Sequence, residues 1–233
     1  MDFLQLVKDR KSTRVPYDEN RGIAPNVLES IFEAATYAPT AHNMQNFEIV
    51  VVDDKSILEA LSNLESPVSS AFIQDNYREV SFSEDELKKR KTGILADRFP
   101  PEWFTLEAKE GKIDTSKFHN KLGEGVRRGP VLLLILYDPN HRAPGSEGDF
   151  LGVMSLGFVL ENMWLMATAQ GLSFRIISAF GNEPLSSEVK KMLNIPEALN
   201  ITLGIVLGYD KSDDNTIRVR RDIKDFVHFN SYE

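Results

Sequence analysis

The chain has 233 residues, of which 42% are hydrophobic and 27% are charged, and it contains no cysteine. A chain of this length buries roughly 70 to 75% of the surface that its unfolded form exposes, so it needs no disulfide or metal to hold a core, and one domain is expected. The missing cysteines exclude thiol nucleophiles and iron–sulfur ligation, and the net charge of −8 disfavours nucleic acid or an anionic membrane as a general partner.

The chain begins with MDFLQLVKDRKS, which has neither a basic leader nor a long apolar run, so we expect a cytoplasmic protein. Phe3, Leu6 and Val7 predict a short amphipathic helix that ends near Arg10. A second helix is predicted over residues 25 to 37, because Pro25 suits a first helical position and apolar residues follow at helical spacing.

The first strand is predicted at residues 47 to 52, FEIVVV, which is too short and too β-branched for a helix and has no polar alternation. We expect it to be buried on both faces. Asp54 then predicts the N-cap of a helix that runs through Leu61. Residues 64 to 129 are the least regular part of the chain and predict a loop or lid, although Ser83 and Glu86 form a capping-box pattern.

The second half of the chain alternates apolar strands with helices. The pattern predicts strands at 131 to 138, 173 to 178 and 201 to 209, a long apolar helix from 150 that ends at Gly171, a helix that begins at Pro184, and a polar arm at 211 to 233 with apolar residues Ile223, Phe226 and Val227. Four strands among helices predict an α+β fold, an α/β sandwich with helices on both faces of the sheet.

The long apolar helix is too polar at its centre for a membrane span, because Glu161 would cost about 2.5 to 3.5 kcal/mol there and Asn162 lies beside it. A helix that is apolar on nearly every side is expected to be buried in a core or across a subunit interface.

Three polar clusters carry the candidate chemistry. They are residues 10 to 14, residues 38 to 45 and residues 218 to 221. Paired guanidinium groups and a hydroxyl suit a phosphate monoester. Singly, each cluster is ordinary, since basic runs are usually solvated faces and Pro, Thr and Asn are common in turns. The four histidines lie far apart, so no metal site is expected.

In combination and order, the clusters resemble the flavin-dependent nitroreductase family. The match excludes roughly residues 64 to 125, and it consists of Arg10, Ser12, Arg14, Ala38, Pro39, Asn43, Gln45, Asn162, Leu165, Ala167, Gly171, Leu172, Arg218 and Arg220. The resemblance implies a mostly antiparallel sheet flanked by helices, in a single domain with an insertion at about 64 to 129. It also implies a homodimer with a non-covalent FMN in the interface and C-terminal arms exchanged between the subunits.

The resemblance also implies which residues bind FMN. Arg10, Ser12, Arg218 and Arg220 would hold the phosphate, Lys11 would lie beside the ribityl chain or ring edge, and Arg14 would face the N1 and O2 edge. Pro39, Thr40, Ala41 and Asn43 would approach from the other subunit with Gln45 nearby, and Ile177, Ser178 and Ala179 would line the ring. The chain departs from the family pattern at Thr40, at Asn46-Phe47, at Ser155 and at Ser178-Ala179-Phe180.

The activity implied is a ping-pong reaction in which NADH or NADPH reduces the flavin and an electron-poor acceptor, such as a nitroaromatic or quinone, is then reduced. The flavin does the hydride chemistry, so no catalytic side chain is named. His42 and the aromatic residues Tyr77, Trp103 and Phe104 are candidates for touching substrate.

Alternatives of other kinds stay open. The insertion could be a substrate lid, as in relatives that dehalogenate halotyrosines or cleave flavin, with Tyr77, Arg78, Glu79 and the lysines 88, 89 and 91 as a clamp for a zwitterion. The other two alternatives are a flavin-binding module without turnover and a scaffold that binds no flavin.

Overall fold

The computed structural model spans residues 1–233 and describes all of them except 1, 14, 75–79, 97–100, 113, 116–118, 124, 125, 127, 146, 214, 215 and 233. The chain forms two compact units. The main unit comprises Met1–Ser66 and Lys121–Asp214, and the accessory unit comprises Pro67–Asn120 and Asn215–Glu233. Most of the predicted insertion and C-terminal arm therefore belongs to the accessory unit.

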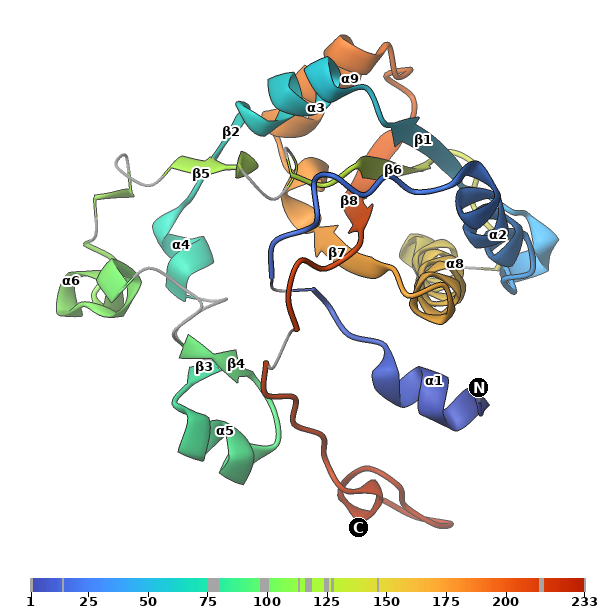
Figure 1. Cartoon of the computed structure of the whole chain (residues 1–233). Coiled ribbons are helices and arrows are strands. Elements are labelled where there is room, and N and C mark those ends of the chain that lie inside the picture. The colour runs from blue at the N-terminus through green and yellow to red at the C-terminus, as the bar shows by residue number, and fades with distance from the viewer. Residues whose placement is uncertain are drawn as a thin grey trace. The chain divides into compact units, whose positions relative to one another are not determined.

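The main unit is built on a four-stranded sheet (Figure 1). Its strands are β1 (Glu48–Val52), β6 (Val131–Tyr137), β7 (Ser173–Ile177) and β8 (Asn200–Gly208), in the order β1-β6-β8-β7. Every neighbouring pair is antiparallel. The four predicted core strands and the predicted α+β fold class are thereby confirmed.

Strand β6 separates the two halves of the core. All seven of its residues are buried. Alternate side chains of a strand point to opposite faces, so Leu132, Leu134 and Leu136 join one hydrophobic cluster while Val131, Leu133 and Ile135 join the other. A continuous apolar run is what a strand covered on both faces requires.

Strand β1 corrects one expectation. It lies at the edge of the sheet, and Val51 is 39% exposed, so the strand is not buried on both faces as predicted. The apolar run FEIVVV signals a strand correctly but does not distinguish a central position from an edge, because that depends on which segments pair with it.

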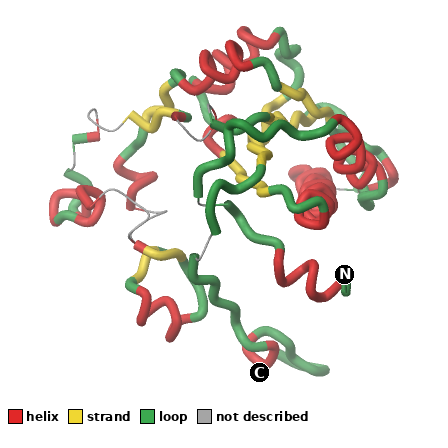
Figure 2. Tube along the Cα trace, viewed as in Figure 1, coloured by secondary structure: helices red, strands yellow, loops and turns green. Residues whose placement is uncertain are grey.

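Helices cover both faces of the sheet (Figures 1 and 2). On one face, α3 (Lys55–Ser62) and α9 (Leu185–Leu193) contribute Leu58, Leu61, Leu185 and Val189 to the first cluster. On the other face, α2 (Pro25–Thr36) and α8 (Phe150–Ala169) pack together against the second cluster. Helix α1 (Phe3–Asp9) also contacts α8.

Helix α8 is long and apolar enough to cross a membrane by length and composition, yet its central polar residues make lateral contacts in the main unit. Glu161 pairs with Arg10, and the Asn162 side chain donates a hydrogen bond to the carbonyl of Ala34 in α2 at 3.1 Å. Its buried residues, Leu156, Val159, Met163 and Ala167, lie on one face. Within this chain the helix is therefore buried on one side only.

The accessory unit has a small core of its own, in which Val68, Ile73, Trp103 and Ala108 pack together. Its described elements are α4 (Ser70–Ile73), β3 (Ser81–Phe82), α5 (Glu84–Arg90), β4 (Ile94–Leu95), η4 (Pro101–Phe104), α6 (Leu106–Lys109) and η8 (Ile223–Asp225). Where the chain passes between the units, β2 (Glu65–Pro67) pairs with β5 (His119–Lys121). The capping box predicted for Ser83 and Glu86 is confirmed at the start of α5.

Within the accessory unit, the C-terminal arm is tied to the insertion. Lys91, which follows α5, forms an ion pair with Asp222 at the start of η8. The hydrogen bond that Lys91 donates to this carboxylate raises the pKa of Lys91. The apolar residues predicted in the arm, Ile223, Phe226 and Val227, are exposed at 73%, 52% and 38%.

Candidate cofactor site

The basic N-terminal segment is held by helix α8. The Arg10 guanidinium lies over the Trp164 ring, with Cζ 4.7 Å from the ring centroid, and its Nε is 3.1 Å from a carboxylate oxygen of Glu161. The indole N–H of Trp164 donates to the carbonyl of Lys11 at 3.2 Å. Stacking on an aromatic ring and pairing with a carboxylate are the two interactions that a planar guanidinium makes best, so Arg10 has a defined orientation.

The next residues run along strand β7. Ser12 forms a parallel bridge with Phe174, and the Thr13 N–H donates to the Phe174 carbonyl at 3.1 Å. The Thr13 hydroxyl is buried and has no hydrogen-bond partner among the residues that the structure describes. A buried polar atom without a partner costs about 1 to 3 kcal/mol, so this hydroxyl fits a polar group supplied from outside the described chain. Arg14 lies outside the described residues.

Strand β7 leads directly into the segment predicted to line the flavin ring. Ile177 ends the strand, and η7 (Ser178–Gly181) follows. Ser178 is exposed, Ile177 and Ala179 are partly buried against the core, and Phe180 is fully buried. The basic segment and the ring-lining segment thus belong to one edge of the sheet.

The loop between α2 and β1 has an unusual backbone. His42, Asn43 and Gln45 all have positive φ, at 52°, 54° and 48°. Such conformations are costly in residues other than glycine and cluster at functional sites. Thr40 closes the loop on itself, because its carbonyl accepts from the Asn43 N–H at 2.9 Å and its hydroxyl from the Gln45 N–H at 3.1 Å.

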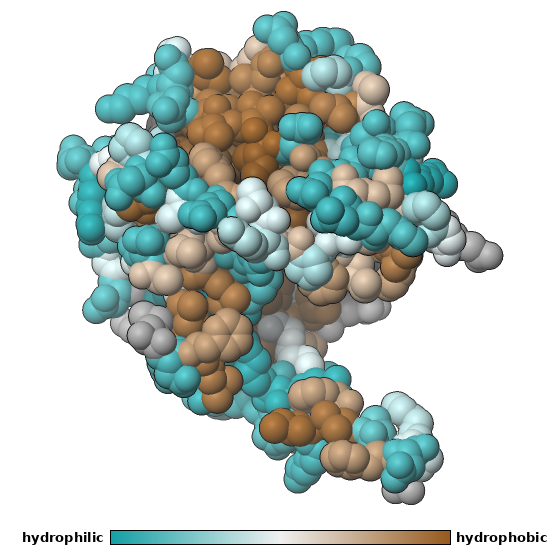
Figure 3. Space-filling view, turned by 90° about the vertical axis from the view of Figure 1, so that its right-hand side faces the viewer, coloured by the Kyte–Doolittle hydropathy of each residue, from teal (hydrophilic) through white to brown (hydrophobic). Residues whose placement is uncertain are grey.

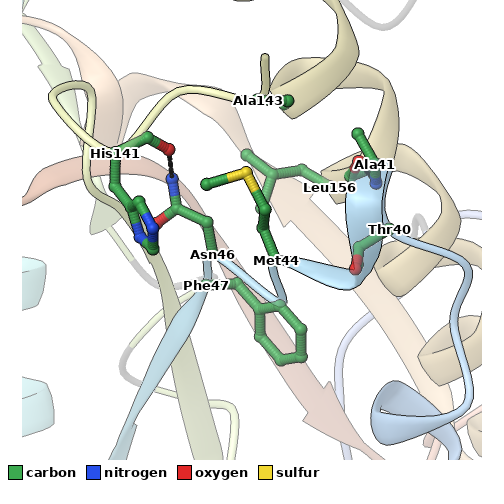
Figure 4. A pocket seen from close by; sticks show the side chains of 10 residues that line it. Thr40, Ala41, Met44, Asn46, Phe47, His141, Ala143 and Leu156 are labelled. Carbon is green, nitrogen blue, oxygen red and sulfur yellow. Dashed lines mark hydrogen bonds between the residues drawn. The ribbon is translucent and has the colours of Figure 1, made fainter.

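The loop is exposed on one side. Pro39, His42, Asn43 and Gln45 are exposed, and the Gln45 side chain donates to Asn43 Oδ1 at 3.3 Å. On the other side, the loop covers a small pocket that is partly open to solvent. Thr40, Ala41, Met44, Asn46, Phe47, His141, Ala143, Gly152, Ser155 and Leu156 line it (Figure 4).

Two residues that sequence reasoning noted only as departures hold this loop. The Ser155 hydroxyl in α8 accepts from the Ala41 N–H at 2.9 Å, and the Asn46 side chain bonds to Asp138 and His141. Sequence reasoning also missed Glu161 and Trp164 as the partners of Arg10. Their i, i+3 spacing places them on one face of a helix and was the available signal.

Arg218 and Arg220 lie in the accessory unit, where an Arg220 guanidinium N–H donates to the Val219 carbonyl at 2.7 Å. Their convergence with Arg10 and Ser12, which belong to the main unit, stays a prediction.

The accessory unit modifies two further expectations. Trp103 is a core residue of this unit, with 8% exposure, so it is not an exposed substrate contact. Two of the three lysines proposed as part of a clamp are engaged in ion pairs, Lys88 with Glu84 and Lys91 with Asp222. The other clamp candidates, Tyr77, Arg78 and Glu79, lie outside the described residues.

Comparison with solved structures finds the same fold in bacterial proteins. An FMN-dependent nitroreductase of Clostridium difficile R20291 is 16% identical, with a TM-score of 0.63, and the match covers 99% of this chain and 100% of that one. A nitroreductase of Bacteroides fragilis solved with bound FMN is 19% identical, with a TM-score of 0.60 and coverage of 99% and 100%. A nitroreductase family protein of Clostridium difficile 630 is 17% identical, with a TM-score of 0.62 and full coverage of both chains.

No curated protein matches the sequence. The model of the nitroreductase family, by contrast, matches residues 7–209, which include the basic N-terminal segment, the positive-φ loop, the whole main sheet and helix α8. The chain therefore belongs to the nitroreductase family.

Proposed function

We propose that the protein is an FMN-dependent oxidoreductase that takes reducing equivalents from NADH or NADPH and passes them to an electron-poor acceptor of the nitroaromatic or quinone type. The observation that carries the proposal is the bridge between Ser12 and Phe174. It joins the basic segment and the segment at 177–179 on one edge of the sheet, so a single ligand with a phosphate and a flat ring can contact both.

The fit of the residues to FMN supports the same reading. Arg10 and Ser12 would hold the phosphate with Arg218 and Arg220, and the buried Thr13 hydroxyl offers a further polar contact. Lys11 and Arg14 would place positive charge beside the ring, and Ile177, Ser178 and Ala179 would form the wall behind it. Bound FMN supplies hydride exchange, while the chain supplies placement, charge and exclusion of water.

We further propose that the active form is a homodimer. Phe150, Val153, Met154 and Phe158 are 42 to 67% exposed and follow one another at helical spacing on α8. Figure 3 views the molecule from the side on which α2 and α8 lie in Figure 1, and apolar side chains are visible at the surface of that face. A second copy of the chain would cover this apolar stripe and bring Pro39, Thr40, Ala41, Asn43 and Gln45 to a flavin shared between the subunits.

The first test is the visible absorption spectrum of the purified protein, with and without added FMN. We expect a bound flavin that bleaches when NADH or NADPH is added without oxygen. Reoxidation by a nitroaromatic or a quinone, and not by a halotyrosine, supports the proposed acceptor class. A flavin that never bleaches would favour a binding module without turnover.

The phosphate assignment has a separate test. The double variant R10A/R220A removes two guanidinium groups, and each charge-assisted hydrogen bond is worth about 1.5 to 3 kcal/mol. We therefore expect FMN affinity to fall more than about 100-fold, measured by quenching of flavin fluorescence. The control R142A/K191A removes the same charge from exposed positions in the main unit. Equal retention of FMN by both double variants would refute the assignment.

A further inference from the structure

The positive-φ loop at residues 40–45 is held at both ends by side chains outside it. At its start, the Ala41 N–H donates to the Ser155 hydroxyl at 2.9 Å. The same hydroxyl donates to the Leu151 carbonyl one turn earlier in α8, at 2.7 Å. The Ser155 hydroxyl thus donates its proton within α8 and accepts from the loop. Because the proton points to Leu151, the lone pairs of the oxygen are oriented toward the Ala41 N–H.

At the end of the loop, Asn46 makes a three-point contact with the turn after β6. Its side-chain amide donates to the carbonyls of Asp138 at 2.9 Å and His141 at 2.8 Å, and its Oδ1 accepts from the Asp138 N–H at 3.2 Å. Both donors and the acceptor of the amide are thus used. Figure 4 shows the Asn46 side chain directed toward His141.

The loop needs such support for two reasons. Three of its residues, His42, Asn43 and Gln45, occupy the left-handed region, which they adopt only when their surroundings impose it. The loop is also only partly covered, since Thr40, Ala41 and Met44 are half-buried above a small pocket that is partly open to solvent. The hydrogen bond that Ser155 accepts from Ala41, and those that Asn46 makes with the turn after β6, therefore help to hold the loop in shape.

We propose that Asn46 and Ser155 are positioning residues that hold the 40–45 loop in its flavin-binding conformation. The inference rests on the proposed function, because the loop contains four of the residues assigned to FMN, namely Thr40, Ala41, Asn43 and Gln45. Neither Asn46 nor Ser155 needs to touch the flavin. Each acts through the backbone of the loop, at opposite ends, so removal of either frees one end and removal of both frees the whole segment.

The test combines two measurements on N46A, S155A and the double variant. Hydrogen–deuterium exchange of peptides covering residues 38–47, recorded on FMN-free protein, reports the loop alone. FMN affinity, measured by fluorescence quenching, reports its consequence. We expect loop exchange to accelerate by about tenfold or more in each variant, because a neutral hydrogen bond contributes about that factor. FMN affinity should fall about tenfold in each single variant and further in the double variant.

Matched controls separate positioning from general destabilisation. T168V removes another hydroxyl of α8. The Thr168 hydroxyl donates to the carbonyl of Trp164, one turn earlier, as Ser155 does to Leu151, but it does not bond to the loop. N140A removes an exposed side-chain amide from the turn to which Asn46 is hydrogen-bonded. We expect both controls to leave loop exchange and FMN affinity unchanged. S155T, which keeps the hydroxyl, should restore affinity to within about threefold of the natural protein.

The outcomes distinguish this inference from the function on which it rests. A natural protein that binds no FMN would overturn the proposed function, and the assignment of the loop to flavin with it. A natural protein that binds FMN, with N46A and S155A binding it equally well, overturns the positioning role alone. Unchanged loop exchange in the double variant refutes the claim that these side chains hold the loop.

Discussion

Single polar side chains carry out distinct tasks in the main unit. Glu161 orients Arg10 through a 3.1 Å contact, Asn46 and Ser155 hold a loop, and Asp54 caps a helix. The Asp54 carboxylate accepts from the backbone N–H of Ser56 at 2.8 Å and of Ile57 at 3.1 Å, and from the Ser56 hydroxyl. These bonds favour the charged form, the hydroxyl bond most strongly, and so lower the pKa of Asp54 from its ordinary 3.8.

Asp54 should therefore stabilise the fold in a pH-dependent manner. Because its pKa is lower in the folded state than in the unfolded state, its contribution is fully present above pH 3.8 and is lost as the pH falls through the lowered value. We expect D54A to unfold at lower urea concentration than the natural protein at pH 7, and the difference to shrink at about pH 3. D53A, a change at the adjacent exposed position, is the control. A difference that is constant with pH would contradict this account.

At the scale of elements, strand β8 supports the segment assigned to the flavin ring by a close approach. A Cβ added to Gly204 in β8 would lie 2.4 Å from the Phe180 ring of η7 and 3.2 Å from Leu132. Phe180 is fully buried, so its ring has no open space to enter. Glycine at 204 thus lets the ring of Phe180 anchor the segment Ser178–Gly181 directly on the sheet.

The substitution G204A tests this contact. Overfilling a packed core costs about 1 to 3 kcal/mol, and a displaced Phe180 would shift Ser178 and Ala179. We expect a lower melting temperature together with an altered spectrum of the bound flavin. G22A is the control, since a Cβ there meets no atom within 4 Å. Loss of stability with an unchanged flavin spectrum would contradict the assignment of η7 to the flavin ring.

At the scale of the whole molecule, helix α8 connects the parts of the proposed site. Its buried face packs on the sheet, Ser155 holds the loop at 40–45, and Glu161 and Trp164 hold Arg10. Its exposed apolar stripe remains uncovered in one protomer. An obligate dimer would account for both properties, because the helix that organises the site would then also form the subunit interface.

Two charges on the stripe should separate the subunits. Val153 and Phe158 are 62% and 42% exposed, so V153E/F158E should be tolerated by the protomer but would bury two unpaired carboxylates from each subunit in a dimer. We expect the dissociation constant of the dimer, measured by sedimentation, to rise at least about 100-fold and FMN to be released. M192E, on the exposed part of α9, should leave the dimer intact. A natural protein that sediments as a monomer with FMN bound would contradict the proposed assembly.

Strand β6, helix α2 and helix α5 could be predicted from the sequence because each depends on local physics. The signals were the apolar run VLLLILY, the preset backbone angle of Pro25 and the reciprocal capping of Ser83 and Glu86. The short pieces of the accessory unit, such as α4 and η4, were missed because few residues repeat at a helical period there. The edge position of β1 was missed because pairing is not local.

By itself, the sequence determined the four strands of the main sheet and the main helices that cover it, since periodicity and caps are carried by neighbouring residues. The ordered motifs indicated the family, and the resemblance to it implied the antiparallel pairing. Only the tertiary structure decided that Arg10 lies on Trp164 beside Glu161, that Thr13 buries a hydroxyl without a described partner, and that Asn46 and Ser155 hold the loop at 40–45. The physical reason is distance along the chain. These contacts join residues that lie about 90 to 150 positions apart, and no local pattern records which distant groups will meet when the core closes.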